Sequence, residues 1–255
     1  MLYTGAQGVV AMMIAWGSHK GSGDWGVKEQ GACGYVRAYC IRGGKVVCRE
    51  GDYTGTLGAG QICFFPSTGG YTLEQDPEDW LRCTYFHLSI APFLLHRTVV
   101  LEAASYPILG SIFDAVDGTA QEKRREVAGY LAEAVEAWCR ETAVFSPAGG
   151  AIARPLAAMS QHYEKDWTIA ELSRMAGYAP GYFVRRFRLE TGLSPHRYLV
   201  ARRMRAAAQL LREGLPVSQV AEKTGYPELK AFSRAFRQWY GMSPTQLRQK
   251  EIRLP

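Results

Sequence analysis

The amino-acid sequence predicts an α+β protein with two domains: an N-terminal β-barrel or jelly roll, and a C-terminal all-α domain with two helix-turn-helix units. Three observations predict this architecture: short strand-like segments in the first hundred residues, a helical texture after residue 150, and a repeat within that helical part. The 255 residues are enough for two domains that each bury a core. We place these domains at 1–100 and 152–250, with a helical linker or dimerisation region at 101–145.

The two parts of the chain carry opposite charge. Residues 1–150 hold 12 Lys and Arg against 16 Asp and Glu, a net charge of −4, whereas residues 151–255 hold 18 against 8, a net charge of +10. A basic half joined to a mildly acidic half predicts a polyanionic partner for the basic half. Nucleic acid is the leading candidate, and a membrane surface is the lesser one.

The cysteines indicate a reducing compartment. None of the six forms a C-x-x-C pair, and most lie in apolar, strand-like contexts that suit reduced thiols. They are Cys33, Cys40, Cys48, Cys63, Cys83 and Cys139. The apolar run VVAMMIAW at 9–16 is too short to span a bilayer and has no basic residue before it, so we interpret it as a strand. The expected location is the cytoplasm, without a membrane partner.

The β texture extends from about residue 9 to residue 90. Runs such as YVRAYCI, KVVC, QICFF and WLRCTYFHLSI are separated by glycine-rich turns, which is typical of a sandwich or barrel. The segment RGGK at 42–45 lies between two of these runs. Because Gly43 and Gly44 can adopt positive φ angles, the sequence predicts a hairpin there with a two-residue turn.

A helix is expected at 121–144. Its apolar positions Val127, Leu131, Ala134 and Trp138 are spaced i, i+4, i+7 and i+11 and form one stripe. The stripe could pack on its own β domain or form a dimer seam, and the sequence does not choose between them. The segment SPAGGA at 146–151 then has the composition of a linker.

The helical part contains a repeat. The stretch RRFRLETGLSP at 185–195 recurs as RAFRQWYGMSP at 234–244, at a constant offset of 49 residues. The similarity extends N-terminally, so the two repeat units lie at 168–188 and 216–237. A repeat of this kind indicates two copies of one supersecondary unit.

Each unit is expected to be two short helices joined by a tight turn. In the first unit, Thr168 and Glu171 form a capping box, Gly177 ends the first helix, and Pro180 begins the second. The expected buried residues are Ile169, Leu172 and Met175 on the first helix and Phe183 and Phe187 on the second. The equivalent buried pair in the second unit is Phe232 and Phe236. This arrangement is a helix-turn-helix.

The second helix of each unit presents a basic face away from its phenylalanine pair. An α-helix fits the major groove of B-DNA, where Arg or Lys can bridge the acceptors of guanine. These arginines could also coat a solvated surface, but their recurrence in both units favours double-stranded DNA as the partner. The predicted DNA-contacting residues are Gly181, Tyr182, Val184, Arg185 and Arg188 in the first unit and Leu229, Lys230, Ser233, Arg234 and Arg237 in the second.

The segment between the two units is expected to be one helix. Residues 198–211 read as a continuous helix of roughly 20 Å. Successive major-groove segments on one face of DNA lie about 34 Å apart, so two units on one rigid helix could each enter one. One chain would then read two groove segments.

On these residues, segment 168–248 resembles the double helix-turn-helix domain of the AraC/XylS family of bacterial transcription regulators. The shared motifs include Ala221, Gly225 and Tyr226 of the second unit and the G-x-S-P that closes each copy. The chain departs from the family pattern at Ala179, where a capping serine is usual, and at Arg186, where an apolar residue is usual. A lost cap costs about 1 kcal/mol, so this helix is expected to be less rigid in the free protein. Because Gly181 and Val184 also offer few hydrogen bonds to bases, we expect the second unit to carry more of the base readout.

The same resemblance implies a cupin-like sensor domain that binds a small polar effector, such as a sugar or a sugar derivative. Strand alternation places Tyr35, Arg37 and Tyr39 on one face, and Arg82, Thr84 and Phe86 on one face of a later strand. The predicted effector-binding residues are Lys28, Tyr35, Arg37, Thr72, Arg82 and Thr84. The alternative is that these are surface charges on a barrel that is packed solid.

A metal site is not expected. Enzymatic cupins converge two histidines and a glutamate on a metal, but this chain lacks H-x-H, and Tyr71 stands where relatives often have histidine. His87 alone is read as a structural residue. We therefore predict no cofactor and no enzyme activity.

The sequence predicts a transcription regulator that responds to a small effector. The expected partners are double-stranded DNA, the effector and a second copy of the chain in a homodimer, and RNA polymerase is a further candidate. The alternatives are a DNA-targeted metal-dependent enzyme or repair protein, and a non-specific architectural DNA-binding protein.

Overall fold

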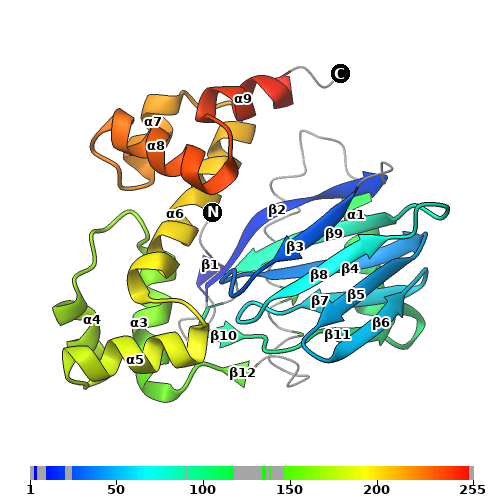
Figure 1. The fold of residues 1–255 in the computed structure, drawn as a ribbon, viewed down its shortest axis with the longest axis horizontal. Coiled ribbons are helices and arrows are strands. Elements are labelled where there is room, and N and C mark those ends of the chain that lie inside the picture. Colours follow the sequence, from blue (N-terminus) through cyan, green and yellow to red (C-terminus); the bar gives the residue numbers. More distant parts are fainter. Residues whose placement is uncertain are drawn as a thin grey trace.

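Two antiparallel sheets face each other in the N-terminal part of the computed structural model, and a series of helices follows (Figure 1). The structure describes residues 3–4, 10–20, 25–89, 91–117, 134–135, 138 and 146–252. Within these residues, no helix is both long enough and apolar enough to cross a membrane.

The larger sheet has six strands in the order β1-β2-β9-β4-β7-β11, and the smaller has four in the order β3-β8-β5-β6. A two-stranded sheet, β10-β12, lies apart from both. The strands are β1 (Tyr3–Thr4), β2 (Val10–Lys20), β3 (Gly26–Glu29), β4 (Val36–Gly43), β5 (Val46–Glu50), β6 (Tyr53–Leu57), β7 (Gln61–Phe65), β8 (Tyr71–Gln75), β9 (Arg82–Ser89), β10 (Phe93–Leu94), β11 (Val99–Glu102) and β12 (Ser146–Pro147). The predicted fold class is confirmed, although the two large sheets remain separate and do not close into a barrel.

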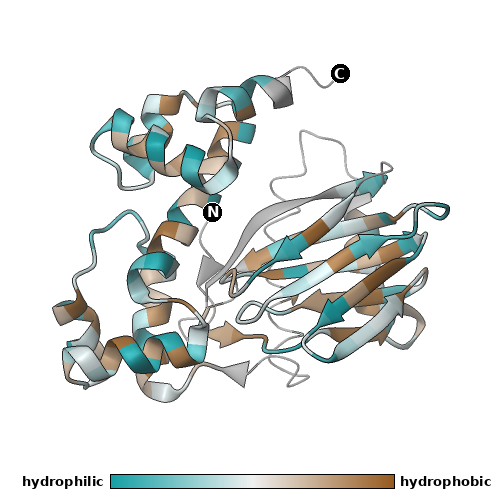
Figure 2. Cartoon of the chain, in the orientation of Figure 1, coloured by the Kyte–Doolittle hydropathy of each residue, from teal (hydrophilic) through white to brown (hydrophobic). Residues whose placement is uncertain are grey.

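Both faces of the six-stranded sheet are buried. One face packs on the four-stranded sheet through a cluster that contains Ile41, Phe65 and Leu73, and these side chains fill the space between the sheets. The other face carries Phe64 and Phe86 and is covered by helix α1 (Pro107–Asp117), which follows the short helix η1 (Ala103–Ser105). Hydrophobic and hydrophilic positions alternate along strands of the smaller sheet, such as β8 (Figure 2). That alternation is typical of strands with one buried face.

The hairpin predicted at RGGK is wrong. Strand β4 pairs with β7 and β9, whereas β5 pairs with β6 and β8, so the chain crosses from one sheet to the other at this point. Gly44 has φ of 80°, and a Cβ built there would lie 2.2 Å from the carbonyl oxygen of Trp80. Glycine is needed here for a tight crossover between sheets.

The C-terminal part is helical as predicted. Its helices are α3 (Gly150–Gln161), α4 (Ile169–Ala176), α5 (Pro180–Thr191), α6 (Pro195–Arg212), α7 (Val217–Lys223), α8 (Leu229–Tyr240) and α9 (Pro244–Ile252). Helices α4 and α5 form the first helix-turn-helix unit, and α7 and α8 form the second. Helix α6 connects them as one continuous helix, and it begins three residues earlier than predicted.

The local signals in each unit are confirmed. Thr168 and Glu171 form the capping box of α4, and Gly177 ends that helix in the left-handed conformation. Phe183 and Phe187 are fully buried. Of the residues predicted to be buried on α4, Leu172 is buried and Ile169 is only partly buried. Met175 was predicted wrongly, because it is 40% exposed, and Ser173 and Ala176 are buried instead. The face of this short helix that packs toward α3 therefore includes the small side chains of Ser173 and Ala176 in place of Met175.

The G-x-S-P motif has the same structure in both copies. Gly192 ends α5 and Gly241 ends α8, each with a positive φ angle. The hydroxyl of Ser194 then accepts a hydrogen bond from the Arg197 backbone N–H at the start of α6. The following proline occupies the first turn of the next helix, where no N–H is needed. The motif is thus a stop signal for one helix joined to a start signal for the next.

The expected helix at 121–144 lies mainly outside the described residues. Of its apolar stripe, Ala134 and Trp138 are described, and both pack on the cluster that α1 covers. The Trp138 ring stacks on Phe64, with ring centroids 5.4 Å apart. At these positions the stripe contacts its own β domain, which is the first of the two alternatives.

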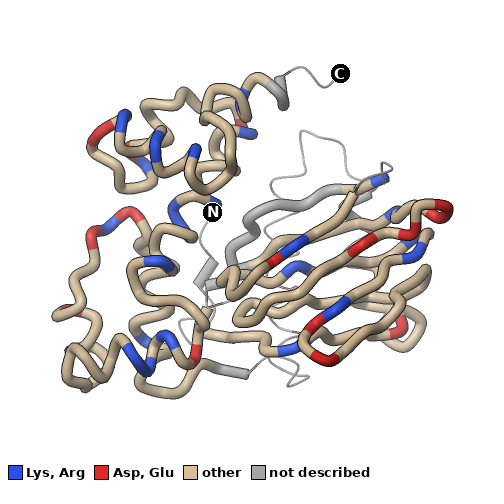
Figure 3. Tube along the Cα trace, in the orientation of Figure 1, with Lys and Arg blue, Asp and Glu red and all other residues tan. Residues whose placement is uncertain are grey.

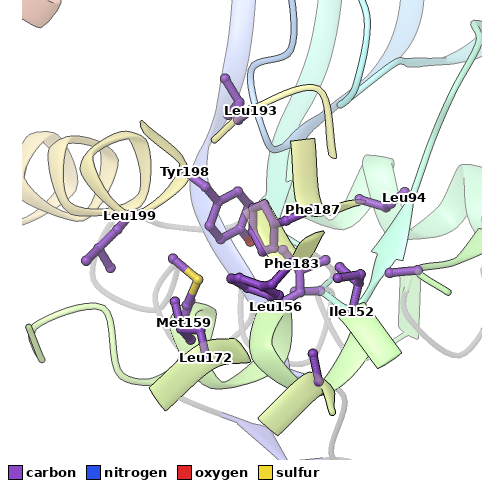
Figure 4. Close-up of a cluster of buried hydrophobic side chains, with 13 residues drawn as sticks. Leu94, Ile152, Leu156, Met159, Leu172, Phe183, Phe187, Leu193, Tyr198 and Leu199 are labelled. Atoms are coloured by element: carbon purple, nitrogen blue, oxygen red, sulfur yellow. The ribbon is translucent and has the colours of Figure 1, made fainter. Parts of the chain in front are cut away.

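The segment 146–151 is packed and does not behave as a free linker. Residues Ser146–Pro147 form β12 against β10, and Ala148 is buried. Its cluster joins Leu94 of β10 to the phenylalanine pair of the first helix-turn-helix unit (Figure 4). The other members named in the close-up are Ile152, Leu156, Met159, Leu172, Leu193, Tyr198 and Leu199. The first unit therefore shares its core with the β10-β12 segment.

Candidate functional site

Helix α5 carries the predicted contacts of the first unit on its outer surface. Gly181, Arg185 and Arg188 are exposed, and Tyr182 is 47% exposed. The guanidinium of Arg185 lies 6.0 Å from the centre of the Tyr182 ring. Val184 is only partly exposed because it also packs on the buried cluster of this unit.

Helix α8 gathers the predicted contacts of the second unit around one surface groove. Lys230, Arg234 and Arg237 are exposed, Leu229 is 48% exposed, and Ser233 is partly buried. All five line the groove together with Gln238. The sequence prediction missed Gln238, although its position four residues after Arg234 places it on the same helix face.

The second helices of the two units, α5 and α8, which we call the recognition helices, begin alike. Ala179, the residue before α5, makes no side-chain cap, but neither does Glu228, the residue before α8. The missing cap therefore does not distinguish the units, contrary to the expectation from Ala179 alone. Arg186, the other departure, pairs with Glu190 at 2.7 Å, and Glu190 also accepts a hydrogen bond from the backbone N–H of Gly149.

Basic positions occur along both recognition helices, and α6 joins them (Figure 3). Helix α6 has 18 residues, which corresponds to a length of about 27 Å. A rigid element of this length is of the same order as the separation of about 34 Å between successive major-groove segments.

The structure does not bring the six predicted effector residues together. Thr84 is fully buried and pairs across the strands with Cys40, on the face of the sheet that α1 covers. Arg82 is exposed beside Gly43 at the end of β9. Thr72 is the cross-strand partner of Lys28 on the smaller sheet. The prediction therefore grouped residues from different faces.

Arg37 belongs to a buried polar network where the two sheets meet the helices. Its Nη1 donates to the hydroxyl of Tyr71, and its Nη2 forms an ion pair with Glu29 at 2.5 Å. Burial raises the pKa of the Tyr71 phenol well above its usual range, although the Arg37 charge acts in the opposite direction. Tyr71 thus serves as a hydrogen-bond partner for Arg37.

Three of the six predicted residues, Lys28, Tyr35 and Arg37, line a cleft of about 970 Å³ between the β sheets and the helices. The opposite wall comes from the turn before α6, from α6 itself and from the end of α8. Among the lining residues there are five basic side chains and one carboxylate, Glu29. The cleft is therefore strongly positive.

Arg205 of α6 is the basic residue of the cleft that lies deepest. It is 5% exposed, and its guanidinium carbon lies 4.1 Å from the centre of the Tyr35 ring. Its Nη1 has no hydrogen-bond partner among the described residues. A buried guanidinium nitrogen without a partner is costly, so this group is suited to an anion. The run ARRMR at 201–205 gave no signal for it, because arginines at 202, 203 and 205 span an arc of about 160° and could all face solvent on one side of a helix.

His87 lies beside these groups on β9. Its ring lies near those of Tyr35, Tyr39 and Tyr85, at centroid distances of 5.3, 6.5 and 5.3 Å. Burial lowers the pKa of His87 well below its usual range, and the Arg37 charge acts in the same direction. His87 is therefore neutral near pH 7. Among the described residues, no three His, Cys, Asp or Glu side chains are grouped so that they could hold a metal ion.

Comparisons with known proteins agree with this organisation. A family model described as a helix-turn-helix domain matches residues 172–250. The transcriptional regulator LumQ of Photobacterium leiognathi is 42% identical over 88 residues, which cover 34% of this chain and 36% of that protein. An AraC-like transcription regulator of Streptomyces antibioticus is 32% identical over 99 residues, covering 38% of this chain and 33% of that protein. The chain thus spans about a third of the length of these curated relatives.

The whole chain has a structural counterpart. The crystal structure of apo ToxT K231A from Vibrio cholerae superposes with a TM-score of 0.61, covering 97% of this chain and 99% of that one. The two sequences are 9% identical. This likeness shows the fold, in which paired sheets precede a helical domain with two helix-turn-helix units.

Proposed function

We propose that the chain is a transcription regulator of the AraC type that binds double-stranded DNA in a sequence-specific way and responds to a small effector. This proposal is supported by the match of residues 172–250 to a helix-turn-helix domain and by relatives of 32% and 42% identity that are described as transcription regulators. The observation that carries this proposal is the pair of outward basic helices, α5 and α8, on one continuous α6. The predicted contact residues remain our assignment for the DNA interface, with Gln238 added to the second unit.

The effector site we propose is the basic cleft. Its two walls come from the sheets and from the helices, so a ligand there would contact both parts of the chain. The unpartnered Nη1 of Arg205 favours a carboxylate, because a charge-assisted hydrogen bond would satisfy that buried group. Lys28 and Tyr35 supply polar groups at the wall. A sugar acid fits this chemistry and narrows the initial expectation of a sugar derivative.

A ligand in the cleft would act by shifting the populations of different conformations of the chain. It would favour arrangements in which Arg205 and the β-sheet residues approach the same anion, and thereby alter the placement of the DNA-binding helices. We further propose that the protein works as a homodimer in the cytoplasm and contacts RNA polymerase. Sedimentation of the purified protein with and without selected DNA checks the dimer.

The test begins with in vitro selection from a randomised duplex library. Wild-type protein should enrich a motif with two half-sites about one helical turn apart. It should bind that duplex at least about 10³-fold more tightly than random DNA at physiological salt. Equal affinity for both duplexes, with a steep salt dependence, would instead indicate a non-specific architectural protein.

Two further measurements address the effector and the rival enzyme function. The Tm of the protein should be measured with sugar acids, fatty acids and neutral sugars. Only compounds with a carboxylate should raise the Tm, and Arg205→Met should abolish that increase. Metal analysis of the purified protein separates the alternatives, because stoichiometric zinc or iron would favour a metal-dependent enzyme.

A further inference from the structure

Three separate segments meet at one point between the two helix-turn-helix units. They are the loop at 163–166 between α3 and α4, Arg203 in the middle of α6, and the turn Gly225 and Tyr226 between α7 and α8. The loop precedes the first unit, and the turn belongs to the second. We call this contact the inter-unit seam.

Arg203 binds the loop at 163–166, which is the first side of the seam. Its Nε donates to the carbonyl oxygen of Tyr163 at 2.7 Å, and its Nη2 lies 3.1 Å from the carbonyl oxygens of both Glu164 and Lys165. The same nitrogen lies 2.8 Å from Asp166, whose side chain is 87% exposed. Because the Arg203 side chain is only 9% exposed, the carbonyl contacts carry most of the interaction.

The second side of the seam packs directly on the first. A Cβ built at Gly225 would lie 2.2 Å from the carbonyl oxygen of Glu164 and 2.8 Å from Nη2 of Arg203. The guanidinium of Arg203 lies 5.5 Å from the centre of the Tyr226 ring. That ring in turn contacts Phe232, in the core beneath recognition helix α8, at a centroid distance of 5.6 Å. The seam therefore connects the loop before α4 to the core of the second unit.

Helix α6 alone does not determine how the two units are oriented. The first unit packs on its N-terminal part through Tyr198 and Leu199, and the second packs on its C-terminal part through Met204 and Leu211. Most of these contacts are apolar and non-directional. The hydrogen bonds that accompany them, between the hydroxyls of Tyr198 and Ser160 and from the Tyr240 hydroxyl to the carbonyl oxygen of Met204, each join α6 to one unit only. The hydrogen bonds of Arg203 are directional and fix a rotation as well as a distance.

We propose that Arg203 is a positioning residue that sets the number of base pairs between the two DNA segments that the protein accepts. The proposal rests on the proposed function, because it assumes that both units enter the same duplex. One inserted base pair moves the second segment by about 3.4 Å and rotates it by about 34°. If the inter-unit seam is rigid, the second unit cannot move to meet the displaced DNA segment. If the seam is loosened, the second unit can move with that segment.

The experiment is in vitro selection followed by binding measurements. Arg203→Met keeps the length of the side chain and removes its donors, and Arg203→Lys retains one charged donor. Wild-type protein should enrich one spacing between its half-sites and should lose at least about tenfold in affinity for a duplex with one inserted base pair. The Met variant should enrich two or more spacings with unchanged half-site sequences and lose less than about threefold on the same insertion, with Lys intermediate.

A matched pair of glycine variants tests the same seam without touching Arg203. Gly177 and Gly225 end the first helices of the two units with φ of 68° and 77°. A Cβ at Gly177 meets nothing within 4 Å, whereas one at Gly225 meets Glu164. Both alanine variants thus carry similar backbone strain, but only Gly225→Ala should broaden the accepted spacing.

The outcomes separate the two proposals. If wild-type protein enriches no motif, the proposed function fails. If it enriches two half-sites and both Arg203→Met and Gly225→Ala keep the wild-type spacing, the seam proposal is wrong. If circular dichroism shows that Arg203→Met does not fold, the glycine pair alone decides. Asp166→Ala should leave the spacing unchanged, since its exposed carboxylate adds little.

Discussion

The guanidinium carbon of Arg205 lies 4.1 Å from the centre of the Tyr35 ring and joins the connecting helix to the β part of the chain. The Arg37 guanidinium lies 4.8 Å from the same ring. Two cations therefore share one aromatic ring at the wall of the basic cleft. The negative face of the ring attracts both cations, but it does not neutralise either of them.

This contact should be measurable as an interaction energy between the two parts of the chain. A double-mutant cycle with Tyr35→Leu and Arg205→Met should give a coupling of about 0.5–2 kcal/mol in urea unfolding. Arg197→Met is the matched control, because Arg197 lines the same cleft but is exposed. A coupling of Tyr35 to Arg205 no larger than that to Arg197 would contradict the cation–π interpretation.

The second unit should depend on Lys230 and Arg234. Substitution of either by alanine should weaken binding to the selected duplex by about 1–3 kcal/mol and relax the base preference at one position. Lys223→Ala serves as control, since Lys223 is exposed on α7 and carries the same charge. It should weaken binding to the selected and random duplexes alike, with a lower salt dependence and an unchanged base preference. Unchanged affinity in both Lys230→Ala and Arg234→Ala would show that α8 is not the reading helix.

Capping serines should stabilise both recognition helices. Ala179 and Glu228 have extended backbone conformations suited to a cap, with ψ of 145° and 122°. Ala179→Ser and Glu228→Ser should each raise stability by about 0.5–2 kcal/mol, measured as an increase in Tm. Thr168→Ala removes an existing cap and should have the opposite sign. A lower Tm for Ala179→Ser would mean that the helix start differs from the one described.

The capping box of α4 predicts a pH dependence. Hydrogen bonding to the Thr168 backbone N–H, followed by the contact with Lys165, lowers the pKa of Glu171 to about 2. The ionised form is thus favoured in the folded state, so its stabilising effect is complete above about pH 4.5 and is lost as the pH falls toward 2. An NMR titration of the carboxyl should find the low pKa, and Lys165→Ala should raise it. A wild-type pKa near 4.5 would rule the box out.

Short-range signals in the sequence predicted the helical part well. Capping residues, the turn glycines and the phenylalanine pairs act over one or two helical turns, so neighbouring residues determine them. The second copy of the pattern then confirmed the interpretation of the first. Met175 was the exception, because α4 has only eight residues and its side toward α3 is selected by tertiary packing.

The β part was predicted in type but not in pairing. RGGK has the composition of a hairpin, yet the strands on either side belong to different sheets. Alternation also predicts which residues share a face within one strand but not how two strands are registered. That is why Thr84 was grouped with Arg37, although Arg37 pairs across the strands with His87 and Thr84 pairs with Cys40. The unexpected Arg205 comes from a segment more than a hundred residues away.

The shared core of the first helix-turn-helix unit limits how this protein can be divided or recombined. The cluster beneath α5 includes Ala91, Leu94 and Ala148, whereas the described residues in the cluster beneath α8 all lie from Val200 onward. In a fragment that begins at α3, the hydrophobic core beneath α5 would therefore be incomplete, whereas the core beneath α8 would be complete. Exchange of sensor domains between such proteins would have to transfer the β10-β12 segment together with the helices that rest on it.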